Sequence, residues 1–207
     1  MSKNITKEQI INTALVLINR KNGSGNVNLR EIARELKCAH TNIYNYYDDI
    51  GQLIWGCAEA ILSQSEQVII NKLSEKKSKH DKLILKVFFE TIADFYLENR
   101  GWFKLIWLDN VNGEKPPEVR DATARTVKTF KNIICNFFHG EITPRQAYRI
   151  LHNVHCYLLG EIISFISGRG FITNRQKFHS YVVNECVKMI KLLVFSIKNE
   201  KINMLIL

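Results

Sequence analysis

The stretch that decides the fold is residues 28–47, with the sequence NLREIARELKCAHTNIYNYY. Its first half has apolar residues at the spacing of one helix face, namely Leu29, Ile32, Ala33 and Leu36. Asn28 stands directly before that face and Glu31 follows three residues later, a pattern typical of a helix start. The sequence therefore predicts a short helix that ends near Leu36.

The second half of the stretch predicts another short helix, from His40 to Tyr47, after a tight turn at residues 37–39. Ile43 and Tyr47 lie one helical turn apart, while the other positions are polar or aromatic. Two short helices joined by a tight turn form a helix-turn-helix, and an α-helix fits the major groove of B-DNA. Helix-helix corners of this size are also frequent in all-α proteins, so the pattern leaves open a short polar helix that caps a core.

The sequence before this stretch adds a third helix and positive charge. Thr6 and Gln9 form a capping box, which predicts a helix over residues 7–20. Residues 1–47 contain seven Lys or Arg and three Glu, a net charge of +4, within a chain whose net charge is +9. Positive charge concentrated in a small domain favours a polyanionic partner.

The remaining sequence predicts helices throughout. Helical spacing of apolar residues is found over residues 51–73, 81–99, 102–107, 118–139, 144–167 and 174–199, with breaks rich in Gly or Pro between several of them. No stretch alternates as a strand does. The expected fold class is all-α, with a three-helix DNA-binding domain at residues 1–50 and a helical ligand-binding and dimerisation domain at residues 51–207.

Residues 6–53 resemble the DNA-binding domain of TetR-family transcriptional regulators. The resemblance is carried by Ile32-Ala33 in the first helix of the motif and by Tyr44-Asn45-Tyr46-Tyr47 at the end of the second. It implies that Ile43 and Tyr47 fix the second helix to the core. It also implies a set of DNA-binding residues: Asn28 and Arg30 near the DNA backbone, with His40, Thr41, Asn42, Tyr44, Asn45 and Tyr46 toward the groove.

Two positions depart from the family pattern. Ala39 stands where a Ser or Thr usually caps the recognition helix, and Ile50-Gly51 replaces the Lys-Glu that usually opens the following helix. The missing lysine removes one phosphate contact. Backbone N–H groups at a helix start also bind phosphate, so Gly51 and Gln52 are expected to take over that contact.

Aromatic residues concentrated between residues 88 and 137 predict a small-molecule site among helices of the C-terminal domain. The residues expected to bind this effector are Phe88, Phe95, Trp102, Trp107, His152 and His155. The alternative is that these rings form an ordinary core. His152, His155 and Cys156 have spacings that place two metal ligands on one helix face, but no acidic partner completes a set. Neither a metal nor another cofactor is expected.

The last two predicted helices have wide apolar faces, which suit a four-helix interface between two copies of the chain. Family resemblance implies the same arrangement. The residues expected at this homodimer interface are Leu158, Ile162, Met189 and Ile190.

Other function classes are disfavoured by what the sequence lacks. It has no catalytic or nucleotide-binding motif, so an enzyme is not expected. Its five cysteines include no C-x-x-C pair, and no apolar stretch approaches about 18 residues, which favours a cytoplasmic protein with no membrane partner. The sequence predicts a repressor that a small molecule releases from a palindromic double-stranded operator. The alternative is a helical ligand-binding or scaffold protein that does not bind DNA, motivated by Ala39 and the missing lysine.

Overall fold

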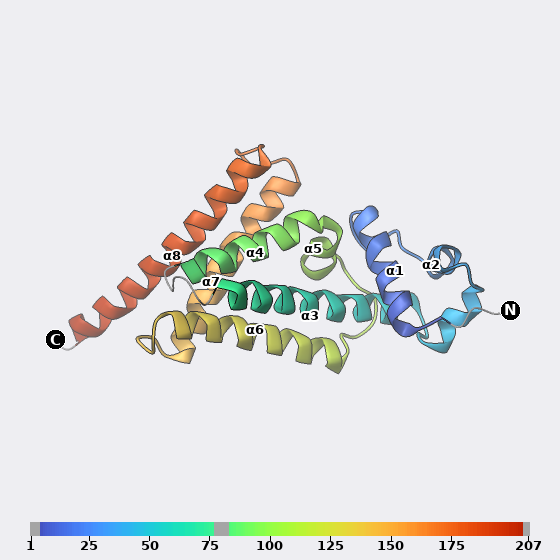
Figure 1. Cartoon of the computed structure of the whole chain (residues 1–207), viewed down its shortest axis with the longest axis horizontal. Coiled ribbons are helices and arrows are strands. Elements are labelled where there is room, and N and C mark those ends of the chain that lie inside the picture. The colour runs from blue at the N-terminus through green and yellow to red at the C-terminus, as the bar shows by residue number, and fades with distance from the viewer. Residues whose placement is uncertain (1–4, 77–82, 205–207) are drawn as a thin grey trace. The chain divides into compact units, whose positions relative to one another are not determined.

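The structure is a computed structural model that describes residues 5–76 and 83–204. Within these residues every regular element is a helix, which confirms the all-α prediction (Figure 1). The chain forms two compact units, which we call the first unit (Met1–Ser65 with Tyr96–Thr126) and the second unit (Glu66–Phe95 with Val127–Leu207). These units are defined by contacts, whereas the boundary at residue 50 concerns function and stays a prediction.

The first unit begins with α1 (Lys7–Arg20), which has the predicted bounds. The Thr6 hydroxyl accepts a hydrogen bond from the Gln9 backbone N–H (3.2 Å), and the Gln9 side chain accepts one from the Thr6 N–H (3.0 Å). The capping box is therefore complete. The apolar face behind it is buried and consists of Ile10, Ala14, Leu15, Leu17 and Ile18.

Helix α2 (Leu29–Leu36) also forms as predicted, because the Asn28 side chain accepts a hydrogen bond from the Glu31 N–H (3.0 Å). Lys37 ends it in the left-handed conformation (φ 54°). The Cys38 N–H then donates to the Ala33 carbonyl (3.0 Å), which closes the last turn of the helix. The tight turn expected at residues 37–39 is confirmed.

The next element departs from the expectation of a regular helix up to Tyr47. It is a 3₁₀ helix, η1 (His40–Asn45), with no side-chain cap at Ala39. Its residues, His-Thr-Asn-Ile-Tyr-Asn, are all weak α-helix formers, so little local preference opposes the tighter winding. Ile43 and Tyr47 are both buried, as the sequence predicts.

The long helix α3 (Ile50–Lys76) contributes residues to both units, as do α4 (Ile84–Glu98) and α6 (Pro117–Phe137). Helix α5 (Arg100–Trp107) belongs to the first unit alone. The predicted start of the fifth helix at Asp81 lies outside the described residues. In the part of the chain that the structure describes, no helix is long and apolar enough to cross a membrane.

The second unit contains α7 (Pro144–Ile166) and α8 (Arg175–Met204), which pack against each other. Thr143 and Gln146 form a second capping box at the start of α7, and Pro144 occupies the first helical position. Six residues of these two helices are buried within the chain: Val154, Leu158, Ile162, Val182, Cys186 and Ile190.

Candidate DNA-binding site

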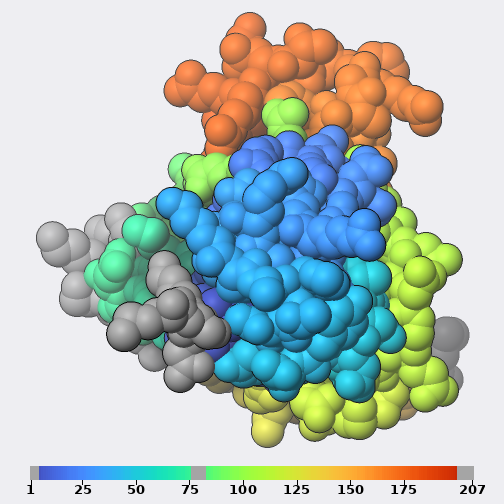
Figure 2. Space-filling model, turned by 90° about the vertical axis from the view of Figure 1, so that its right-hand side faces the viewer, coloured from blue at the N-terminus to red at the C-terminus, as the bar shows by residue number. Residues whose placement is uncertain are grey.

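The corner formed by α2, the turn and η1 presents polar side chains to solvent. Ile43 is fully buried and fixes η1 to the rest of the unit, while Tyr44 on the opposite side is 50% exposed. His40, Thr41 and Asn45 are exposed as well, and Asn42 is half-buried. Figure 2 shows the N-terminal segment, drawn in shades of blue, as one continuous surface turned toward the viewer. All nine predicted DNA-binding residues lie in the first unit.

Tyr46 is tied to the N-terminal segment. Its hydroxyl donates a hydrogen bond to the Ile5 carbonyl at 2.5 Å, and its ring is 38% exposed. The phenol of Tyr46 thus anchors residue 5 and retains only acceptor capacity for DNA.

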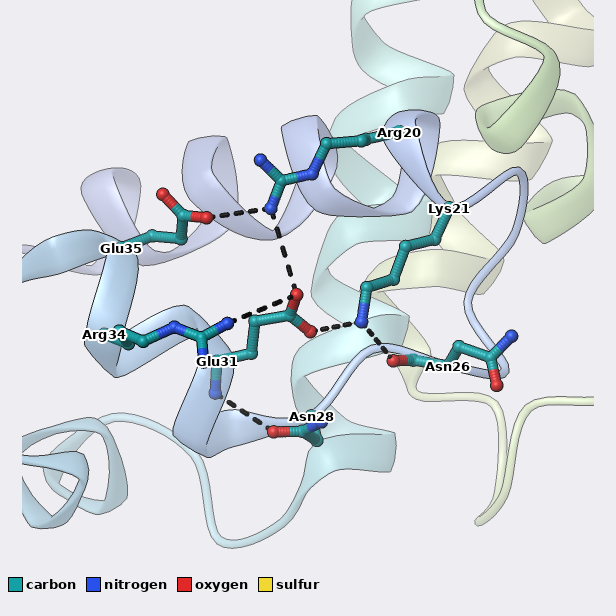
Figure 3. Close-up of polar contacts among 7 residues, drawn as sticks. All are labelled: Arg20, Lys21, Asn26, Asn28, Glu31, Arg34 and Glu35. Carbon is teal, nitrogen blue, oxygen red and sulfur yellow. Dashed lines mark hydrogen bonds and ion pairs between the residues drawn. The ribbon is translucent and has the colours of Figure 1, made fainter.

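Glu31 organises the charged groups between α1 and α2 (Figure 3). Its carboxylate pairs with Lys21, and it lies 3.8 Å from the guanidinium groups of Arg20 and Arg34. Arg20 also pairs with Glu35 at 2.8 Å. Only 12% of the Glu31 side chain is exposed, which makes these contacts less screened by solvent than ordinary surface pairs.

This network changes how the positive charge of the domain is distributed. Lys21 forms an ion pair with Glu31 and donates a hydrogen bond to the Asn26 carbonyl (2.7 Å). Arg20 forms ion pairs with the carboxylates of Glu31 and Glu35. These cations hold α1 and α2 together. Arg30 is exposed on α2, which leaves it accessible to a DNA backbone.

The start of α3 was predicted to bind a phosphate group, but one of its backbone N–H groups is already hydrogen-bonded. The Asp49 carboxylate accepts a hydrogen bond from the Gln52 N–H (2.8 Å), so an anionic side chain already caps this helix. Gly51 is buried, and a Cβ atom at this position would lie 2.7 Å from the Asn112 carbonyl oxygen. The structure therefore explains the glycine by close packing, whereas its contact with phosphate stays a prediction.

The contacts that join α5 to α1 were not predicted from the sequence. A Cβ atom on Gly101 would lie 2.2 Å from the Ile18 carbonyl oxygen, so the two backbones touch there. The Asn19 side chain accepts a hydrogen bond from the Gly101 N–H (3.1 Å), and the Trp102 indole donates to the Leu15 carbonyl (2.9 Å). The glycine within a helix was the available signal.

A second tie joins the loop after α1 to the end of α5. The Asp109 carboxylate accepts hydrogen bonds from the backbone N–H (2.6 Å) and the hydroxyl (2.8 Å) of Ser24. Together with the Gly101 contact, it makes α5 part of the same packed body as α1.

The predicted effector residues are divided between the two units. Trp102 and Trp107 belong to the first, whereas Phe88, Phe95, His152 and His155 belong to the second. Phe88 is fully buried and packs edge-on against Phe89 and Phe130, with ring centroids 5.0 and 5.1 Å apart. It serves as a core residue, the alternative that the sequence left open.

The two predicted effector histidines have different environments. His152 is exposed, with its ring parallel to that of Tyr148 and its Nε2 atom 3.8 Å from the Cys156 sulfur. Burial, with a smaller contribution from His152, lowers the pKa of His155 to about 4, so this imidazole is neutral near pH 7. Among the described residues, no three metal-ligating side chains lie close enough to hold an ion.

The four residues predicted at the dimer interface are mostly buried within the single chain. Leu158, Ile162 and Ile190 are fully buried, and Met189 is half-buried. The outer surface of the same two helices carries other large apolar side chains: Tyr148, Tyr181, Leu192 and Phe195, each at least 42% exposed.

Comparison with known proteins gives similarity of fold. No protein-family model and no curated protein matches the chain. A protein of unknown function from Rhodococcus sp. RHA1 has a TM-score of 0.75 and 15% identity, covering 93% of this chain and 97% of its own. A TetR variant from Acinetobacter baumannii AYE in complex with minocycline has a TM-score of 0.64 and 18% identity, covering 91% and 96%. The transcriptional regulator FadR from Bacillus subtilis, in complex with stearoyl-CoA, has a TM-score of 0.59 and 17% identity, covering 91% and 98%. The chain therefore has the all-helical fold of TetR-family transcriptional regulators.

Proposed function

We propose that this chain is a ligand-responsive transcriptional regulator, a repressor that a small molecule releases from a palindromic DNA operator. The observation that carries the proposal is the corner of α2 and η1. It exposes Thr41, Tyr44 and Asn45 on a backbone held in place by the buried Ile43. Asn pairs with adenine edges, and Thr or Tyr donates to bases or phosphates, so these side chains suit contacts in the major groove.

A palindromic operator requires two copies of the DNA-binding corner. We place the homodimer interface on the outer surface of α7 and α8, where Tyr148, Tyr181, Leu192 and Phe195 are exposed. The predicted residues Leu158, Ile162 and Ile190 are buried in the same two helices, and Met189 is half-buried. The bound minocycline and stearoyl-CoA of the two relatives support a small-molecule effector for this chain.

DNA binding should depend steeply on salt, because phosphate contacts release counterions. Fluorescence anisotropy with a labelled duplex from the DNA flanking the gene should show at least about a hundredfold loss of affinity between roughly 50 and 200 mM salt. Arg30→Ala should reduce the slope of log affinity against log salt by about one for each subunit's lost phosphate contact. A flat salt dependence, or no binding at low salt, would contradict DNA recognition by this surface.

A charge on the outer surface of α8 should separate the dimer. Leu192 is 57% exposed, so Leu192→Glu should leave the subunit folded but give monomers with weakened operator binding. Val16→Glu is the matched control, since Val16 is a 62% exposed apolar residue on α1. Sedimentation velocity at micromolar concentration measures the effect. The interface is wrong if the unsubstituted protein sediments as a monomer, or if Leu192→Glu remains a dimer.

The runner-up function is helical ligand binding without DNA recognition. It is favoured by two observations: η1 lacks a side-chain cap at Ala39, and Asp49 places a carboxylate at the start of α3. A gel shift with the flanking DNA separates the two functions, because only a regulator retards a specific duplex in the presence of excess unrelated DNA.

A further inference from the structure

A small cavity of about 100 Å³ lies at the turn that joins α7 to α8, drawn in orange in Figure 1. Its volume is well below the roughly 300–1,000 Å³ of pockets that enclose a whole drug-sized ligand. The cavity therefore fits one small chemical group at the end of a molecule. Five of the residues that line it carry rings or charge: Glu161, Phe165, Phe171, Phe178 and Tyr181.

Four of these lining residues are aromatic. The rings of Phe165 and Phe178 are nearly parallel, with an interplanar angle of 16° and centroids 4.3 Å apart. Phe178 is buried, so this stacked pair forms the inner part of the lining. Tyr181 is 42% exposed and Phe171 is fully exposed, so these two rings lie where the cavity meets solvent.

The turn that carries Phe171 is fixed by hydrogen bonds on both sides of this residue. The Ser164 carbonyl accepts hydrogen bonds from the backbone N–H groups of Arg169 (3.0 Å) and Gly170 (2.9 Å). The Asn174 side chain accepts one from the backbone N–H three residues later (2.9 Å), which caps the start of α8. The exposed phenyl ring of Phe171 is therefore held beside the cavity by a turn with a defined backbone.

Glu161 adds a half-buried carboxylate to the same lining. Burial raises the pKa of the Cys186 thiol to about 12, and the charge of Glu161 adds to this rise, so the carboxylate lies close to α8. The basic residues nearest to the turn in sequence, Arg169, Arg175 and Lys177, are exposed. Solvent screens their charges more strongly than the charge of the half-buried Glu161.

Ring faces together with a carboxylate favour a cation. The face of an aromatic ring carries partial negative charge and attracts a positive group placed over it, as a carboxylate does. A primary ammonium group has three N–H donors, which ring faces satisfy less well than water does. A trimethylammonium group has no N–H donor and presents methyl groups to the rings, so it meets no such penalty.

We propose that this cavity binds the trimethylammonium group of a small soluble molecule. Glu161 supplies the counter-charge, and Phe171 and Tyr181 contact the bound group on its solvent side. All of these residues belong to α7, the turn and α8, and none of them is among the residues that the sequence predicted for an effector. The proposal does not depend on DNA binding by the chain.

Choline and its neutral isostere 3,3-dimethyl-1-butanol test the charge requirement on the unsubstituted protein. The two molecules have the same shape, but a carbon atom replaces the charged nitrogen. Isothermal titration calorimetry should show saturable binding of choline, at least about tenfold tighter than that of the alcohol. Protonated ethanolamine, which lacks the methyl groups, should also bind at least about tenfold more weakly than choline. The proposal is overturned if choline does not bind saturably at millimolar concentration, or if either other compound binds equally well.

Substitutions at two lining positions test the location. Phe171→Leu keeps an apolar side chain but removes the ring, so it should weaken choline binding about two- to fivefold, whereas Phe171→Tyr should bind choline as tightly as the unsubstituted protein. Glu161→Gln should weaken choline at least about tenfold. Glu185→Gln, at a half-buried carboxylate on α8 that is not among the described lining residues, is the matched control and should have no effect. Unchanged choline affinity in Phe171→Leu and Glu161→Gln proteins with normal helical circular dichroism would contradict the assignment.

A second copy of the chain is the competing occupant, because Tyr181 also belongs to the proposed dimer surface. Choline titration of Leu192→Glu, which is expected to be monomeric, separates the two. Affinities that agree within about twofold support a site built by one chain and open to solvent. Binding by only one of the two proteins would overturn such a site. Choline binding by a protein that binds no DNA would refute the proposed function and leave this site standing.

Discussion

Gly101→Ala is expected to destabilise the protein by about 3 kcal/mol, because its new methyl group cannot be accommodated by side-chain movement. The added Cβ would lie 2.2 Å from the Ile18 carbonyl oxygen and 2.6 Å from the Asn19 Cα atom. Both are backbone atoms of α1, so α1 and α5 must move apart. Separation should also break the hydrogen bond from Trp102 to Leu15. Urea unfolding followed by circular dichroism measures the loss.

Gly160→Ala is the matched control for this prediction. Gly160 lies inside α7, and a Cβ atom there would meet nothing within 4 Å in the chain. Replacing a helical glycine by alanine should then raise the free energy of unfolding by about 0.5–1 kcal/mol. The close approach of α1 and α5 is wrong if both substitutions change stability in the same direction and by similar amounts.

Ile43→Ala and Tyr44→Ala should separate the stability of η1 from its proposed role in DNA binding. Ile43 is fully buried, so its truncation should leave a cavity that costs about 2–5 kcal/mol. Tyr44 is half exposed, so its truncation should cost no more than about 0.5 kcal/mol. Operator affinity, in contrast, should fall at least about tenfold for Tyr44→Ala under conditions where the variant is folded.

Chemical denaturation and DNA anisotropy on the same samples check this pair of expectations. Equal losses of stability would mean that the exposed face of η1 has been assigned to the wrong side. A Tyr44→Ala protein that is fully folded and binds the operator normally would show that the tyrosine does not contact DNA. Asn45→Ala offers a second exposed position on the same element.

Local signals in the sequence accounted for most of the fold. Thr6 with Gln9, Asn28 with Glu31, and Thr143 before Pro144 each predicted a helix start that the structure confirms. Capping acts between residues three apart, so it is visible without knowledge of tertiary structure. The burial of Ile43 beside exposed Tyr44 could be predicted for the same reason, because it follows from local spacing and the helix-turn-helix resemblance.

The sequence could not predict which residues contact each other in the folded chain. Leu158 and Ile190 look the same in sequence whether they contact a second subunit or another helix of the same chain, and the structure shows that both are buried within the chain. Aromatic content predicted Phe88 as a ligand residue; the structure shows that Phe88 is buried against Phe89 and Phe130, and its contact with a ligand stays a prediction. Ile70 and Ile133 line one cavity although they lie far apart in sequence, and no periodicity in the sequence brings them together.

Any exchange of the N-terminal segment between proteins of this fold would have to preserve the contacts between α1 and α5. A transplant of residues 1–50 alone would replace the Ile18 backbone under Gly101 and remove Ser24, the hydrogen-bond donor to Asp109. In the chimera, the transplanted α1 would then have to fit in van der Waals contact against the α5 helix of the recipient protein. A graft that carries residues 96–126 with residues 1–65 keeps both sides of each contact, and the junctions then fall within helices α3, α4 and α6. Chimeras of proteins with this fold are therefore best designed with three coordinated junctions instead of one.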